Sequence, residues 1–192
     1  MTSNGLDHQA EQFAAWVRDH SRAIRGYLLG MTRRTDTADD LLQEVFRRAW
    51  QARESYRENG HARAYLLRIA DRLVCDRNRK GRPEITLDGA DWRTLEPSNH
   101  DGDPLHKLDL QEEIAQLNKA MQRLSPIQRR VLLLRFYGQM GFAEIADEVG
   151  CPLGTALSHC RRGLEELRTL LVEKAKMGTG FESKTAVPSK KN

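Results

Sequence analysis

The sequence predicts an all-α protein with two small helical domains joined by an acidic flexible linker, the second domain ending in a helix-turn-helix. Apolar residues recur at steps of three and four along every long segment. A stretch rich in proline and acidic residues separates two such sets of segments. No run approaches the length of a membrane span and the N-terminus has no signal pattern, so a cytoplasmic protein is expected.

The first predicted domain, residues 8–81, opens with two helices. The first covers residues 8–31, and Gly26 and Gly30 weaken it toward its end. The second begins at Thr35-Asp36-Thr37 and runs to about Ala52. One side of the second helix is apolar and ends in Trp50. The other side is polar, which simple solubility explains as well as binding does; it carries Asp40, Gln43, Glu44, Arg47 and Arg48.

The third predicted helix, residues 62–79, lies in the most basic stretch of the chain. From His61 to Arg82 there are seven Arg and Lys residues against two Asp, for a net charge of +5. The polar loop before it, residues 51–60, carries Tyr56. A basic helix beside aromatic residues fits contact with a nucleic-acid backbone and with unstacked bases.

The composition changes between residues 82 and 104. This stretch has three prolines, a net charge of −4 and no helical stripe. It is expected to be a linker and is too acidic to lie on DNA. The second predicted domain covers residues 105–173, and residues 174–192 form a polar tail expected to be disordered.

The second domain is predicted to contain four helices. The first covers residues 105–124, and Ser125-Pro126 caps the second, residues 127–137. A third runs from Gly141 to a stop at Gly150 and Pro152. The fourth begins at Gly154-Thr155 with Thr155 as N-cap. Its expected inner face contains Ala156, Cys160, Gly163, Leu164, Leu167 and Leu171.

The last two helices, with a short glycine turn between them, are typical of a helix-turn-helix. An ordinary helical hairpin in a bundle is the alternative, and spacing alone does not separate the two. The polar residues near the start of the last helix favour DNA, because hydroxyl, imidazole and guanidinium groups suit phosphates and base edges. These residues are Thr155, Ser158, His159, Arg161 and Arg162.

Nothing in the sequence indicates an enzyme. His100 and His106, with Asp101 and Asp103, fit no established metal-ligand spacing. The cysteines are an odd set without short pairing, so reduced structural thiols are expected. No phosphate-binding glycine loop or nucleophile-base arrangement is present. We expect no metal, no cofactor, no catalytic residue and no small-molecule substrate.

Both halves together resemble the extracytoplasmic-function sigma factors of bacterial RNA polymerase. Region 2.2 of that family resembles residues 39–50, Asp39-Asp40-Leu41-Leu42-Gln43-Glu44-Val45-Phe46-Arg47-Arg48-Ala49-Trp50. Regions 2.3 to 2.4 resemble residues 64–70, Ala64-Tyr65-Leu66-Leu67-Arg68-Ile69-Ala70, with Asp76 and Arg79. Region 4 resembles residues 124–137, from Leu124-Ser125-Pro126 to Arg135-Phe136-Tyr137, and the helix-turn-helix after them.

The resemblance implies a transcription initiation factor that binds core RNA polymerase and directs it to promoters through their −10 and −35 elements. It places Asp40, Gln43, Glu44, Arg47 and Arg48 on the clamp helices of the largest polymerase subunit. It also implies contacts with the flap of the second-largest subunit, with promoter DNA and with an anti-sigma factor. The residues expected at the −10 element are Arg53, Tyr56, Asn59, His61, Arg63, Arg68, Arg72, Arg77 and Arg79. Those expected at the −35 element are Thr155, Ser158, His159, Arg161 and Arg162.

The chain departs from the family pattern at two places. Relatives usually carry Arg-Asn after the Ile-Ala of region 2.4, where this chain has Asp71-Arg72. Their recognition helix usually reads Gly-Thr-Val-Lys-Ser-Arg, and here residues 154–159 read Gly-Thr-Ala-Leu-Ser-His. A stand-alone helix-turn-helix regulator is the alternative function, but it leaves the first domain and the acidic linker unexplained.

Overall fold

The computed structural model describes residues 3–56, 60–79 and 104–178, and within these ranges it is all-helical. The predicted fold class is therefore confirmed for the described residues, while the predicted linker, apart from Pro104, lies outside them. The helices are α1 (Ser3–Thr32), α2 (Thr35–Gln51), α3 (Ala62–Arg79), α4 (Pro104–Arg123), α5 (Pro126–Gly138), α6 (Phe142–Val149) and α7 (Leu153–Gly178).

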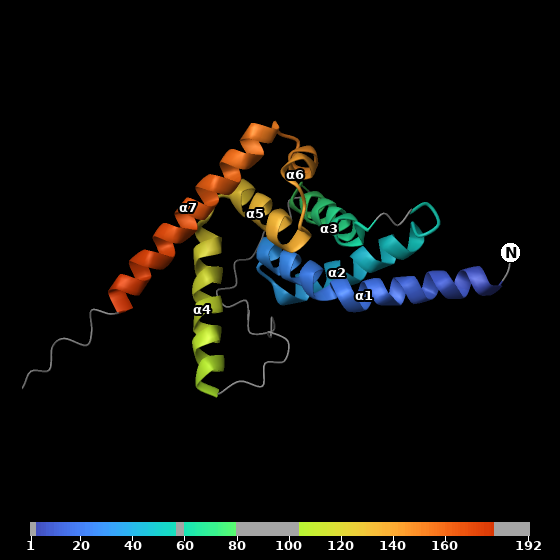
Figure 1. Cartoon of the computed structure of the whole chain (residues 1–192), viewed down its shortest axis with the longest axis horizontal. Helices are drawn as coiled ribbons and strands as arrows, with labels where there is room; N and C mark the ends of the chain where they lie inside the picture. Colours follow the sequence, from blue (N-terminus) through green and yellow to red (C-terminus); the bar gives the residue numbers. More distant parts are fainter. Residues whose placement is uncertain (1–2, 57–59, 80–103, 179–192) are drawn as a thin grey trace, which may run out of the picture.

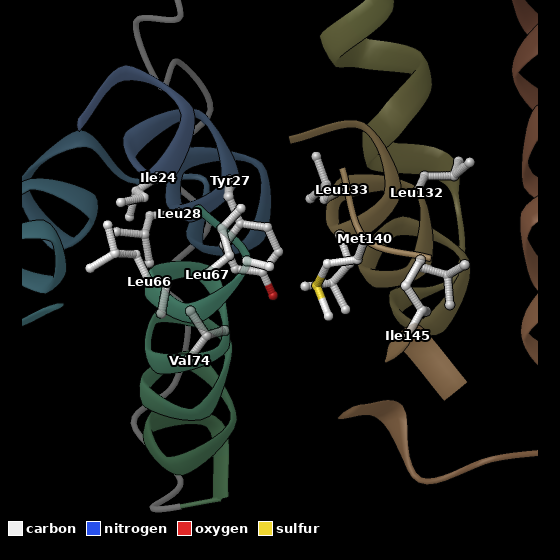
Figure 2. Packing of buried hydrophobic residues seen from close by; sticks show 14 of the residues in the cluster. Ile24, Tyr27, Leu28, Leu66, Leu67, Val74, Leu132, Leu133, Met140 and Ile145 are labelled. Atoms are coloured by element: carbon white, nitrogen blue, oxygen red, sulfur yellow. The ribbon is translucent and has the colours of Figure 1, made fainter. Parts of the chain in front are cut away.

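The first three helices pack on one another, and α5 lies between them and α7 (Figure 1). Ile24, Leu66 and Val74 fill the centre of the first half, while Met140 and Ile145 fill the second (Figure 2). These buried residues belong to one continuous cluster. The two predicted domains are therefore packed directly against each other in this structure.

Two glycines of α1 allow α5 to approach closely. A Cβ atom on Gly26 would overlap the ring of Tyr137, with the ring Cζ only 2.9 Å away. A Cβ atom on Gly30 would lie 2.8 Å from Cδ1 of Leu133. Real Cβ atoms do not come so near other carbons. If α1 had side chains in place of Gly26 and Gly30, α5 could not pack this closely against it. The glycines that the sequence marks as weak points of α1 thus form a notch for α5.

The structure confirms two of the helix ends predicted for the second half and corrects a third. The Ser125 hydroxyl accepts the Gln128 N–H, and the Gln128 side chain accepts the Ser125 N–H at 2.9 Å, forming the predicted cap of α5. Gly150 ends α6 at φ 74°, as expected for a glycine stop. The expected N-cap role of Thr155 is wrong. The Pro152 carbonyl accepts the Thr155 and Ala156 N–H groups at 2.9 and 3.1 Å, so α7 begins two residues earlier, at Leu153.

Several boundaries and faces also differ from expectation. α1 begins at Ser3, five residues before the predicted start, and α7 continues to Gly178, because one more turn on an existing helix needs no new nucleation. α2 does begin at Thr35, as expected, after an N-cap residue, Arg34, that makes no side-chain capping bond. Trp50 and Leu164 were expected inside but are 36% and 43% exposed. Leu164 borders a cavity of about 490 Å³ that Leu117 and Phe136 also line.

Candidate nucleic-acid interface

The polar face of α2 is a charged, solvent-facing surface whose side chains are held by hydrogen bonds. Asp40, Gln43, Arg47 and Arg48 are exposed, and Glu44 is half-buried. The Glu44 carboxylate accepts hydrogen bonds from Arg47 Nε and Nη2 and from Arg48 Nε, each at 2.7 Å. The bonds from Arg47, and then those from Arg48, lower the pKa of Glu44 to about 2. All five predicted residues therefore lie along one side of α2, with the central carboxylate ionised and clamped.

The loop after α2 is anchored by an aromatic cluster. The Tyr56 ring lies 4.4 Å from that of Tyr65 and 4.8 Å from that of Trp16, measured between centroids. The Arg53 guanidinium lies 4.2 Å above the Trp50 ring and donates to the Trp50 carbonyl at 2.9 Å. These contacts hold the start of the loop against α1 and α3. His61, at the end of the loop, is exposed, and Asn59 lies outside the described residues.

The cations of α3 do not form one open basic face. Arg63 donates to the Tyr137 carbonyl, and Arg68 donates to Glu144 at 2.9 Å. Arg72 lies 3.4 Å from a Glu148 oxygen, and Arg68 lies 3.8 Å from the other. Three of the predicted −10 residues thus contact α5 or α6 of the second half. Of the other two predicted arginines on α3, Arg79 pairs with Asp76 on its own helix and Arg77 is half-buried.

A buried polar network that the sequence reasoning missed lies beside these pairs. The Asp71 carboxylate is fully buried, and it accepts hydrogen bonds from Tyr27 of α1 and from Arg130 of α5. The Arg130 Nε bond measures 2.8 Å, and Arg130 Nη2 also donates to the Glu148 carbonyl at 3.0 Å. The available signal was an aspartate directly after the apolar pair Ile69-Ala70, at a position where the family pattern has another residue.

Burial and charge in this network shift the pKa values of Tyr27 and Arg130. Burial raises the pKa of Tyr27 well above its ordinary value of 10.0, and the charge of Asp71 raises it further. Burial alone would lower the pKa of Arg130, but the hydrogen bonds and charge of Asp71 outweigh it and raise the pKa. The pair is therefore an ionic bridge with the tyrosine hydroxyl as a second donor to the carboxylate.

The start of α7 carries the residues expected to read DNA. Arg161 and Arg162 are exposed, while Thr155, Ser158 and His159 are half-buried. The Ser158 hydroxyl donates to the Gly154 carbonyl at 2.8 Å, and an Arg161 nitrogen lies 3.9 Å from Glu165. Leu157 is 44% exposed on the same stretch. This surface therefore offers two guanidinium groups and an apolar side chain that can pack on a thymine methyl.

The described residues contain no group of three potential metal-ligating side chains. Within those same ranges no helix is long and apolar enough to cross a membrane. Cys75, Cys151 and Cys160 are free thiols, and burial raises the pKa of Cys160. His100, Asp101 and Asp103 lie outside the described residues, and the side chain of His106 is not described.

Comparison with known proteins covers both halves of the chain. The family "Sigma-70 region 2" matches residues 16–84, and the family "Sigma-70, region 4" matches residues 114–167. The ECF RNA polymerase sigma factor RpoE of Cereibacter sphaeroides is 30% identical over 167 residues, covering 84% of this chain and 88% of the relative. The chain belongs to the ECF sigma factor family. SigW of Bacillus subtilis is 32% identical, covering 70% of this sigma factor and 75% of the relative.

This sigma factor also shares its fold with a solved structure. The sigma factor RpoE in complex with the anti-sigma factor NepR from Bartonella quintana superposes with a TM-score of 0.63 at 24% identity, covering 84% of this chain and 97% of that chain. The family models and curated relatives, which cover both halves, make this chain a promoter-specific initiation factor of RNA polymerase, with polymerase and promoter DNA as partners. Because the relatives span both halves, the alternative of a stand-alone helix-turn-helix regulator is not favoured. Proteins of this family are initiation factors and not enzymes.

Proposed function

We propose that this sigma factor docks on core RNA polymerase through the polar face of α2. Asp40, Gln43, Glu44, Arg47 and Arg48 would contact the clamp helices of the largest subunit. The observation that carries this assignment is their place on one side of the helix, where four exposed residues surround the half-buried Glu44 carboxylate that two arginines hold in place. A fixed pattern of charges favours a partner whose surface carries the opposite charges at matching positions. It also steers the diffusional encounter with that partner.

Promoter contacts are assigned to two surfaces, one in each half. In residues 8–81, taken as region 2, the loop after α2 and the arginines of α3 would contact the −10 element, with Arg68 and Arg72 binding phosphates. In residues 105–173, taken as region 4, the start of α7 would read the −35 element in the major groove through Thr155, Ser158, His159, Arg161 and Arg162. Residues 82–104 would join the two.

The remaining proposals concern partners and setting. A second contact would be made with the flap of the second-largest polymerase subunit. An anti-sigma factor is proposed as the regulator, since the solved relative from Bartonella quintana is in complex with one. The chain would work in the cytoplasm, where polymerase and DNA are, and would itself catalyse no reaction. Residues 179–192 of the tail receive no role.

Charge reversal on α2 tests the docking surface. The double variant Asp40→Lys/Glu44→Lys is expected to weaken binding to core polymerase by roughly tenfold or more, about 1.4 kcal/mol, because it sets like charges against the partner surface. The matched control, Glu11→Lys/Asp19→Lys, makes the same change in charge at exposed positions of α1. Affinity for core polymerase is measured by fluorescence anisotropy of labelled sigma factor, and helicity by circular dichroism. Equal loss in the two folded variants would reject the α2 assignment.

A further inference from the structure

We propose that this chain holds itself in a closed state in which the glutamates of α6 pair with Arg68 and Arg72 of α3, so that promoter DNA and α6 compete for the same arginines. The inference rests on the proposed role of α3 at the −10 element. It concerns the free sigma factor before it meets polymerase and DNA. Three independent features of the interface between the two halves carry it.

The first feature is a pair of matched charge rows. Arg68 and Arg72 lie one turn apart on α3, and Glu144 and Glu148 lie one turn apart on α6. Arg68 donates to Glu144 at 2.9 Å, and Arg72 lies 3.4 Å from Glu148, whose side chain is only 8% exposed. Carboxylates therefore occupy the positions on these guanidinium groups that phosphate oxygens would take. Phosphate groups must displace these carboxylates before DNA can bind both arginines.

The second feature is Asp71, in the middle of the same row. Residues 68, 71, 72 and 75 follow one another at helical spacing on one side of α3. A lone carboxylate between two phosphate-binding arginines would repel DNA. In the closed state its charge is matched by Arg130 of α5, and the pair is buried. An aspartate at this position is thus explained by the closed state and not by DNA binding. Because desolvation offsets much of its attraction, such a buried ion pair adds little stability. Its main effect is to favour one arrangement of the two halves over others.

The third feature is the fit of α5 into α1. Arg130, Leu133 and Tyr137 follow one another on one side of α5, and all three meet the first half. The ring of Tyr137 and the Leu133 side chain fill the notch at Gly26 and Gly30. Figure 2 shows Leu133 and Met140 of the second half facing Tyr27 and Leu67 of the first. This face of α5 is therefore shaped for the first half and stays buried only while the chain is closed.

Two variants open the interface in different ways. Gly26→Ala places a methyl group where the Tyr137 ring lies, yet it favours the α1 helix itself, because alanine is the better helix former. Glu144→Gln/Glu148→Gln removes the charges that hold Arg68 and Arg72 and keeps the side-chain shapes. The control Glu112→Gln/Glu113→Gln, at exposed positions of α4, removes the same two charges elsewhere. It corrects for the general gain in DNA affinity that any loss of negative charge produces.

The full chain is measured without polymerase in two ways. Small-angle X-ray scattering gives the radius of gyration, which should increase in Gly26→Ala and in the α6 double variant but not in the control. Anisotropy with mixed-sequence single-stranded DNA should show about three- to tenfold tighter binding by both, since closure reduces apparent affinity by the fraction of open molecules. An unchanged radius together with a gain in affinity no greater than that of the control would overturn the closed state.

Transcription with core polymerase separates this inference from the proposed function. If wild type and both variants support promoter-dependent transcription while the scattering curves coincide, the closed state is rejected and the roles of α2 and α3 stand. If Arg68→Ala/Arg72→Ala leaves DNA binding and open-complex formation unchanged, the role of α3 is rejected, and the inference with it. If Gly26→Ala unfolds the first half, the α6 double variant decides alone, because its substitutions lie in the second half and keep the side-chain shapes.

Discussion

Replacing Tyr27 with phenylalanine isolates one hydrogen bond in the buried network. The substitution removes the hydroxyl that donates to Asp71 and keeps the ring, which is fully buried, so it leaves no cavity of ring size. Asp71 retains both hydrogen bonds from Arg130, and its charge stays compensated. The expected loss is therefore that of one hydrogen bond to a charged group, about 1.5–3 kcal/mol. This loss of unfolding free energy is smaller than the ~3–5 kcal/mol expected when a buried ion pair is broken.

Urea unfolding followed by circular dichroism measures this loss, and thermal unfolding should show a midpoint lower by about 3–12 °C for a chain of this size. Tyr137→Phe is the matched control. Tyr137 also lies at the interface, packed against Gly26, but it is half-buried, so removal of its hydroxyl leaves no buried charge without a partner. Its loss should change the free energy of unfolding by less than about 0.5 kcal/mol.

The pH dependence gives a second check on Tyr27. Its folded pKa is raised above the ordinary value of 10.0, so above pH 10 the unfolded chain loses the proton while the folded chain keeps it. The stability of the wild type therefore falls as pH rises past 10, and the phenylalanine variant lacks this component. The gap between the two should narrow with rising pH. A Tyr27→Phe protein within 0.5 kcal/mol of wild type at neutral pH, or a gap that does not narrow, would refute the reasoning.

Three further predictions address other elements. The pKa of Glu44 is lowered from 4.5 to about 2, chiefly by Arg47. The difference in unfolding free energy between wild type and Glu44→Gln should therefore be constant above about pH 5 and vanish as pH falls toward 2. Urea titrations across that pH range measure this difference. Ser125→Ala should lower the free energy of unfolding by about 1 kcal/mol through loss of the Gln128 capping box, whereas an unchanged urea midpoint would count against the cap. His159→Arg should tighten binding to −35 duplex by ~1 kcal/mol in anisotropy at fixed salt, because a guanidinium can bind guanine at two atoms; weaker binding would make His159 itself the reader.

Much of this protein follows from local sequence. Helical spacing and the Ser125 and Gly150 signals predict the helices of the second half and the ends of α5 and α6, because these depend on neighbours in the chain. Opposite charges one turn apart likewise place Glu44 between Arg47 and Arg48 on the solvent side of α2. Local rules were less reliable where several helix start positions are nearly equal in energy. The last helix is an example: it begins at Leu153, with the Pro152 carbonyl and not the Thr155 side chain accepting the first N–H groups.

Only the tertiary structure decided how the two halves meet. Composition counts Arg68, Arg72 and Asp71 only as charges on a basic helix, but their partners lie 44 to 76 positions away in the chain. Gly26 and Gly30 read locally as weak helix positions, and only the approach of α5 turns them into a contact surface. Pairing between distant segments depends on complementary shape and desolvated charge in three dimensions, and periodicity along one helix carries no information about either.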